Sequence, residues 1–152
     1  MGRYYYGDIE GKFLLGIQDF SDVGFFGGNE EEVYDTDLDG EMDFSTQVGI
    51  FFSFFPRHEA KVKQMVEVCD ENLGSWLPKL ESYFERASTF NEEKIAREFG
   101  AEPSDVREML AWYAKFEIGN KILECLQKKG QCFFNVDFYY ETVFSFGSDS
   151  RH

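Results

Sequence analysis

The order of hydrophobic and polar residues along the chain changes near Pro56 and again near Gly130. Before Pro56 and after Gly130, apolar residues recur at every second position, which is the period of a strand with one buried face. Between these points they recur at helical spacing. Strands, then helices, then strands predict an α+β fold in a single domain, residues 1–152. We expect an antiparallel sheet from N- and C-terminal strands, with a central block of about four helices packed on one face.

The first stretch predicts two strand units, over residues 3–18 and 33–55, separated by a Gly-rich loop over 19–29. The dipeptide Asp39-Gly40 is typical of a tight hairpin turn inside the second unit. The last stretch, residues 131–146, predicts a strand that inserts beside an N-terminal one. The positions expected on the core face share one parity in each unit: Ile50, Phe52 and Phe54 before the helices, and Cys132, Phe134 and Val136 after them.

The middle stretch predicts helices at about 57–71, 77–86, 91–99 and 104–129. Asn91 and Ser104 are expected to cap the last two of these helices at their N-termini. Gly100 and Gly130 are expected to end them.

Acidic residues concentrate in the first third of the chain. Residues 1–56 hold 12 Asp and Glu against 2 bases, whereas residues 57–130 hold 14 against 12, within a net charge of −14. A run from Glu30 to Asp43 contains eight carboxylates and no base. Such a run repels nucleic acid and anionic membranes and attracts cations and basic protein surfaces.

Part of this run resembles the first half of an EF-hand calcium loop. Asp35, Asp37 and Asp39 alternate, Gly40 stands at the sixth place and Glu41 at the seventh. The twelfth place, normally a bidentate Glu, is Thr46, and the flanking pattern is that of strands. The same residues can therefore form a weak metal site or a solvated acidic hairpin, and any calcium binding is expected to be weak.

A second group of charged residues, Asp8, Glu10 and Lys12, alternates along the first predicted strand. Two carboxylates and a lysine on one strand face could hold a divalent cation and stabilise a phosphoryl transition state. The Glu-x-Lys pair resembles the second half of a nuclease motif, although no strand precedes Asp8 to supply the usual first Asp. The alternative is the solvent face of an edge hairpin.

Residues 95–110 resemble a helix-turn-helix, with Ala96 at the helix crossing and Gly100 at the turn. Its second helix would present Asp105 and Glu108 beside Arg107, and both acids would face phosphates. We therefore expect a packed helix pair that binds no DNA.

Histidine and cysteine supply little catalytic chemistry. The histidines are His58, expected at the surface near a helix start, and His152. Three cysteines, an odd number without metal spacing, favour reduced buried thiols and a cytoplasmic protein. No apolar run reaches the ~18 residues of a membrane span, and charges interrupt the N-terminal segment where a signal peptide would need an apolar run.

The function that these features favour is a non-enzymatic, inhibitor-type interaction protein. Its carboxylates would occupy a basic protein surface, including one that normally holds nucleic acid. The residues expected to bind the partner are Glu31, Tyr34, Asp35, Asp37, Asp39 and Glu41. Rings near the acids would serve as anchors: Tyr4, Tyr5, Tyr6, Phe25, Phe26 and Tyr34.

Two alternatives stay open at this point. One is a magnesium- or calcium-dependent hydrolase of the phosphodiesterase or nuclease type, which would use Asp8, Glu10 and Lys12. The other is a homo-oligomer that binds a small ligand between subunits, because the aromatic fraction of 18% exceeds what one small core needs. An enzyme needs the carboxylates of the first strand and the acidic run to converge, whereas an interaction protein needs them spread along a surface.

Overall fold

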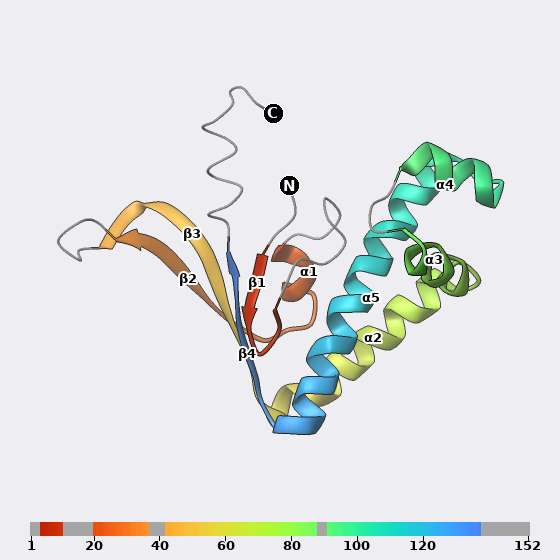
Figure 1. The fold of residues 1–152 in the computed structure, drawn as a ribbon. Coiled ribbons are helices and arrows are strands. Elements are labelled where there is room, and N and C mark those ends of the chain that lie inside the picture. Colours follow the sequence, from red (N-terminus) through yellow and green to blue (C-terminus); the bar gives the residue numbers. More distant parts are fainter. Residues whose placement is uncertain (1–3, 11–19, 37–41, 88–90, 138–152) are drawn as a thin grey trace.

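The computed structural model describes residues 4–10, 20–36, 42–87 and 91–137, and it shows a four-stranded antiparallel sheet with helices on one side (Figure 1). The α+β class and the arrangement of N- and C-terminal strands are confirmed. The strands are β1 (Tyr4–Gly7), β2 (Asn29–Thr36), β3 (Met42–Phe54) and β4 (Cys132–Asp137). The helices are α1 (Phe20–Gly24), the 3-10 turn η1 (Pro56–His58), α2 (Glu59–Leu73), α3 (Trp76–Glu85), α4 (Glu92–Phe99) and α5 (Pro103–Lys129).

The strands lie in the order β1-β4-β3-β2, so β4 separates the N-terminal strand from the β2–β3 hairpin. Tyr5 pairs with Val136, which pairs in turn with Ile50 of β3. The prediction that the C-terminal strand inserts beside an N-terminal one is therefore confirmed. This order also leaves β1 and β2 at opposite edges of the sheet.

The face of the sheet that meets the helices carries the residues of the predicted parity. Ile50, Phe52 and Phe54 are buried, as are Cys132, Phe134 and Val136. The Phe134 ring stacks between two of these, with centroid separations of 5.7 Å to Phe52 and 6.3 Å to Phe54. Burial of this aromatic face against α2 and α5 is the main apolar contribution to the sheet half of the fold.

A second hydrophobic cluster lies away from the sheet, between α3, α4 and the first half of α5 (Figure 1). Leu73, Leu80 and Leu110 are 1%, 0% and 2% exposed there. Because α5 contributes to both clusters, it joins the sheet half to the helical half.

The sequence predicted both ends of α4 and the C-terminal end of α5 correctly, whereas α2 and α3 are displaced from their predicted ranges by one or two residues. Asn91 caps α4 by accepting the Lys94 N–H at 3.0 Å, and Gly100 ends that helix with a φ of 68°. Gly130 ends α5 in the same left-handed conformation. The predicted cap at Ser104 is wrong, because α5 begins one residue earlier at Pro103, whose missing N–H costs nothing in a first turn.

Two boundaries in the N-terminal third differ from prediction. β1 ends at Gly7 rather than continuing through the predicted unit, since Gly7 adopts a φ of 125° and the chain turns there. The predicted loop over 19–29 contains α1, and β2 already begins at Asn29. The short helix forms because it buries Val23 against α5, a tertiary contact that periodicity does not reveal.

Three further features of the prediction bear on the site. Thr36 pairs with Met42, while the predicted Asp39-Gly40 turn lies outside the described residues. The three cysteines are buried and unbridged, as expected. Within the described ranges, no helix is long and apolar enough to cross a membrane.

Candidate functional site: a charged pocket and an acidic sheet edge

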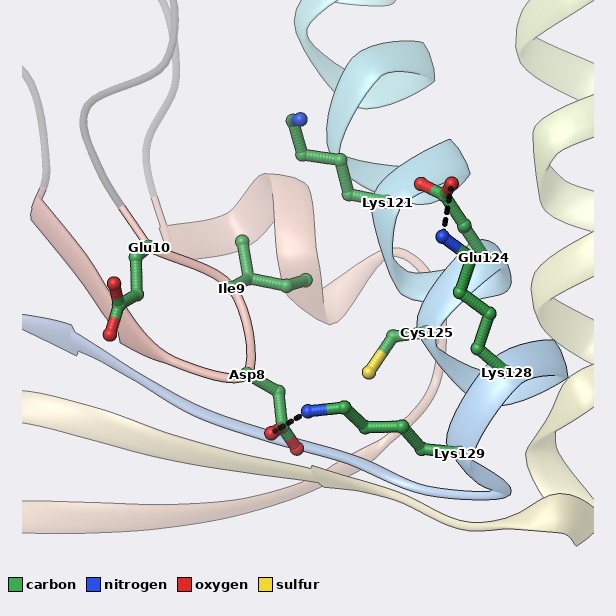
Figure 2. Close-up of a pocket in the computed structure, with 8 residues that line it drawn as sticks. All are labelled: Asp8, Ile9, Glu10, Lys121, Glu124, Cys125, Lys128 and Lys129. Carbon is green, nitrogen blue, oxygen red and sulfur yellow. Dashed lines mark hydrogen bonds and ion pairs between the residues drawn. The ribbon is translucent and has the colours of Figure 1, made fainter.

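A pocket of about 250 Å³ lies between the end of β1 and the C-terminal half of α5 (Figure 2). Asp8, Ile9 and Glu10 line one side of it. The helix lines the other with Lys121, Glu124, Cys125, Lys128 and Lys129. The sequence marked the first side as a catalytic candidate but missed the helix side, because these residues are more than a hundred positions away along the chain.

Asp8 is held by partners on two elements. Its Oδ1 accepts from the Lys129 ammonium at 3.0 Å, and its Oδ2 accepts from the Phe133 N–H at 2.8 Å. Its own N–H donates to the Phe133 carbonyl at 2.8 Å. The Phe133 hydrogen bond, followed by Lys129, lowers the pKa of the Asp8 carboxyl below 3.8. Asp8 therefore links the end of β1 to β4 and to the end of α5. Each of its carboxylate oxygens already accepts a hydrogen bond from a group of the protein.

The predicted alternation of Asp8, Glu10 and Lys12 on one strand face is wrong for its first two members. Both follow the end of β1, and Figure 2 shows the Glu10 carboxylate turned away from the Asp8–Lys129 pair. Lys12 lies outside the described residues. Two lysines of the pocket are paired with acids, since Lys129 lies 3.0 Å from Asp8 and Lys128 lies 3.2 Å from Glu124.

The carboxylates of β1 and β2 do not converge. Asp8 contacts Phe133 of β4, and Phe133 pairs with Ser53 of β3. Ser53 pairs in turn with Asn29 at the start of β2. Three strand spacings, roughly 14 Å, therefore separate Asp8 from β2. Among the residues that the structure describes, no group of three or more His, Cys, Asp or Glu is arranged to hold a metal ion.

Two thiols lie beside this pocket. The Cys125 Sγ donates to the Gln131 carbonyl at 3.2 Å. Burial raises the pKa of the Cys132 thiol. It also raises the pKa of the third cysteine, Cys69 of α2, to about 11. A high pKa keeps both groups protonated and poorly nucleophilic near neutral pH.

The part of the acidic run that belongs to β2 lies at the opposite edge of the sheet. Glu30, Glu31 and Glu32 are exposed along β2, and the Tyr34 hydroxyl donates to Glu32. Within the described part of the chain, no ion pair neutralises these three glutamates. Asp35 pairs with Asp43 by backbone register. The side chains of both, together with Asp37, Asp39 and Glu41, lie outside what the structure describes. The calcium-loop resemblance therefore stays untested.

The sheet face turned away from the helices is aromatic beside this acidic edge. Cross-strand pairing aligns Tyr6, Asn135, Phe51 and Glu31 in one row across all four strands. Tyr6 is 44% exposed and Phe51 is half-buried. On the same face, the centroid of the Phe133 ring of β4 lies 6.2 Å from that of Phe51 and 5.4 Å from that of Phe55. These rings share one surface with the Glu31 carboxylate.

The structure corrects the choice of aromatic anchors. Tyr5 and Phe26 are fully buried in the core and cannot contact a partner. Phe25 packs against Trp112 at a centroid distance of 5.9 Å. Phe51 and Phe133 are the half-buried rings of the outer sheet face that the sequence analysis did not name, although their parity, opposite to the core residues, was the signal that could have found them.

The predicted helix pair is present as α4 and α5, with its turn at Gly100. Arg107 is bound within the pair, because its Nε and Nη2 donate to the two Glu92 carboxylate oxygens at 3.2 and 2.9 Å. Asp105 and Glu108 are exposed next to it. These observations support the prediction that the pair binds no DNA, and a binding experiment is its test.

His58 is half-buried rather than freely exposed. Its Nδ1 accepts the Phe55 N–H at 2.8 Å, which fixes the turn between β3 and α2. Burial, followed by the charge of Arg57, lowers the pKa of the imidazole below 6.5. His58 therefore has a structural role at this turn.

A second acidic surface was missed by the sequence analysis. A hollow of about 540 Å³ is lined by Glu81, Phe84, Glu85, Tyr113 and Glu117. The Phe84 and Tyr113 rings stack at 5.5 Å between centroids, and burial raises the pKa of Glu117. Spacings of four residues, Glu81 to Glu85 and Tyr113 to Glu117, were the available signal.

Comparison with known proteins adds no assignment to this geometry: no protein-family model matches the chain, and neither a curated protein nor a solved structure matches it significantly.

Proposed function

We propose that this chain is a non-enzymatic interaction protein that binds a basic protein surface through β2 and the adjoining aromatic face. The observation that carries the proposal is the placement of the carboxylates. Glu30, Glu31 and Glu32 are spread along a sheet edge instead of converging on a point. A row of negative charge beside the half-buried Phe51 ring is complementary to Lys and Arg, which pair with carboxylates and also stack on aromatic faces.

The metal-dependent enzyme has less support. Its first candidate ligand, Asp8, has one oxygen on Lys129 and the other on the Phe133 N–H. Asp35, which belongs to its second group of carboxylates, lies on β2 at the far edge of the sheet. A hydrolase of nucleic acid would also have to draw a polyanion towards a protein with a net charge of −14.

The test compares two variants with the same net charge. Replacing Glu30, Glu31 and Glu32 by Gln removes three charges from β2. Replacing Glu67, Glu71 and Glu108 by Gln removes three exposed charges from the helices. The net charge of −14 becomes −11 in both, so only the location of the charge differs.

Partners captured from the cell that expresses the protein are then quantified by mass spectrometry for the wild type and both variants. The β2 variant should lose partners that the helix variant keeps, and association with a recovered partner should slow most at low salt. If that partner normally binds nucleic acid, duplex DNA should compete with the protein for it. Equal partner profiles for the two variants would contradict the proposal and leave the acidic run as a determinant of solubility.

A further inference from the structure

β2 is an eight-residue strand at the end of the sheet order. Within the described part of the chain, β3 is the strand that pairs with it, and no strand pairs along its outer side. The register is regular from Asn29 to Val33 and shifts at Tyr34 and Asp35. An edge strand presents a row of backbone N–H and C=O groups to solvent, and each group can pair with an added strand.

The side chains of this edge restrict what can pair with it. Glu31 stands opposite Phe51 on the outer face of the sheet, whereas Glu30 and Glu32 stand opposite core residues of β3. Acids therefore occur on both faces of the same edge. An added strand would bring its side chains within about 5 Å of them, at which distance like charges destabilise the pair and opposite charges stabilise it.

This charge pattern discriminates between two kinds of strand that could pair with the β2 edge. A second copy of the chain, paired through β2, would bring glutamates against glutamates on both faces. A segment rich in Lys or Arg would place a cation beside each carboxylate while its backbone bonded to the edge. The charge of the edge thus excludes self-pairing and favours a basic strand.

We infer that the β2 edge accepts an extended basic segment of a partner protein as a fifth strand of the sheet. This inference rests on the proposed function and specifies its binding mode. Backbone hydrogen bonds to Asn29–Val33 supply the attachment, and Glu30, Glu31 and Glu32 select the basic sequence.

The experiment uses the full chain and two synthetic peptides. The first is Val-Thr-Lys-Lys-Lys-Val-Thr with blocked ends. The second has the same sequence with N-methyl groups on every other backbone amide. It is prepared in two forms, one methylated at the odd positions and one at the even positions. Each form keeps every charge but loses the backbone N–H donors that are methylated. Binding is measured by fluorescence anisotropy at physiological salt, and the exchange of individual backbone amides is followed by NMR.

The unmodified peptide should bind and should slow exchange at alternate amides between Asn29 and Val33. One of the two N-methylated forms should bind about tenfold more weakly than the unmodified peptide, because it loses two or more backbone hydrogen bonds to β2. The glutamine variant of Glu30, Glu31 and Glu32 should also weaken the unmodified peptide. The matched variant with Gln at Glu67, Glu71 and Glu108 should not.

Three outcomes overturn the inference. Equal binding of all peptides without protection of β2 would show docking by charge alone, and the proposed function would survive. Protection of β2 that grows with protein concentration in the absence of peptide would show that a second copy is the occupant. Binding by none of the peptides would reject strand addition, and the partner-capture comparison would then decide the proposed function independently.

Discussion

Asp8 is the residue whose replacement best separates a structural role from a catalytic one. The Asp8→Ala variant loses the charge-assisted hydrogen bond from the Phe133 N–H, at 2.8 Å, and the ion pair with Lys129, at 3.0 Å. A hydrogen bond to a charged group contributes about 1.5–3 kcal/mol. The Lys129 side chain is 59% exposed, so solvent screening makes its ion pair the smaller of the two contributions. We expect Asp8→Ala to lower the free energy of unfolding by about 2–3 kcal/mol.

Two further variants resolve these contributions. Asp8→Asn keeps an acceptor for the Phe133 N–H but loses the charge, and its expected cost is about 1 kcal/mol. Lys129→Met removes the ion pair and keeps the Phe133 hydrogen bond, so its cost in stability should be well below that of Asp8→Ala. The order of destabilisation is therefore Ala at position 8 first, then the other two variants.

Urea denaturation followed by circular dichroism measures these differences, with the pH as a second variable. The pKa of Asp8 in the folded protein lies below its ordinary value of 3.8, so the folded state favours the charged form. The contribution of this charge is complete above the ordinary pKa and is lost as the pH falls through the folded pKa. The difference between the wild type and Asp8→Asn should shrink in that acidic range.

The result that would refute this reasoning is an Asp8→Ala variant that unfolds at the same urea concentration as the wild type. The two contacts would then contribute nothing, and the Asp8 carboxylate would return as a candidate for catalysis. An Asp8→Ala cost equal to that of Lys129→Met would instead assign the whole effect to the ion pair.

Three other perturbations have definite expected outcomes. Gly119→Ala would place a Cβ 2.4 Å from the Phe26 ring, so overpacking of about 1–3 kcal/mol should outweigh a gain in helix propensity of about 1 kcal/mol. Thermal melts measure the resulting loss of stability. The control is Ala111→Gly at an exposed position, which loses helix propensity alone. Asp22→Asn removes one partner of an ion pair at 3.3 Å whose acid side chain is 7% exposed, and urea denaturation should show a loss of about 3 kcal/mol. The depressed pKa of His58 means that its contribution to stability is full above 6.5 and falls as the pH drops below that value, so replacing His58 by Asn should flatten the dependence of Tm on pH in this range.

The sequence by itself determined the local structure. Alternation predicted which side chains of β3 and β4 face the core, and helical spacing predicted the central helices. Asn91, Gly100 and Gly130 marked their own helix ends, because capping depends on one residue and the few backbone groups beside it. Clustered carboxylates were visible in the same way, since charge is a property of composition.

Tertiary structure alone decided how these parts meet. The strand order β1-β4-β3-β2 places the acidic strand at one edge of the described sheet and the first strand at the other. Asp8 meets Lys129 across 121 positions of chain, and Gly119 leaves the space into which the Phe26 ring packs. Periodicity reports whether a residue faces the core but not which neighbour it will find there. That choice depends on packing between distant segments, and it made Asp8 a structural anchor and β2 an exposed acidic edge.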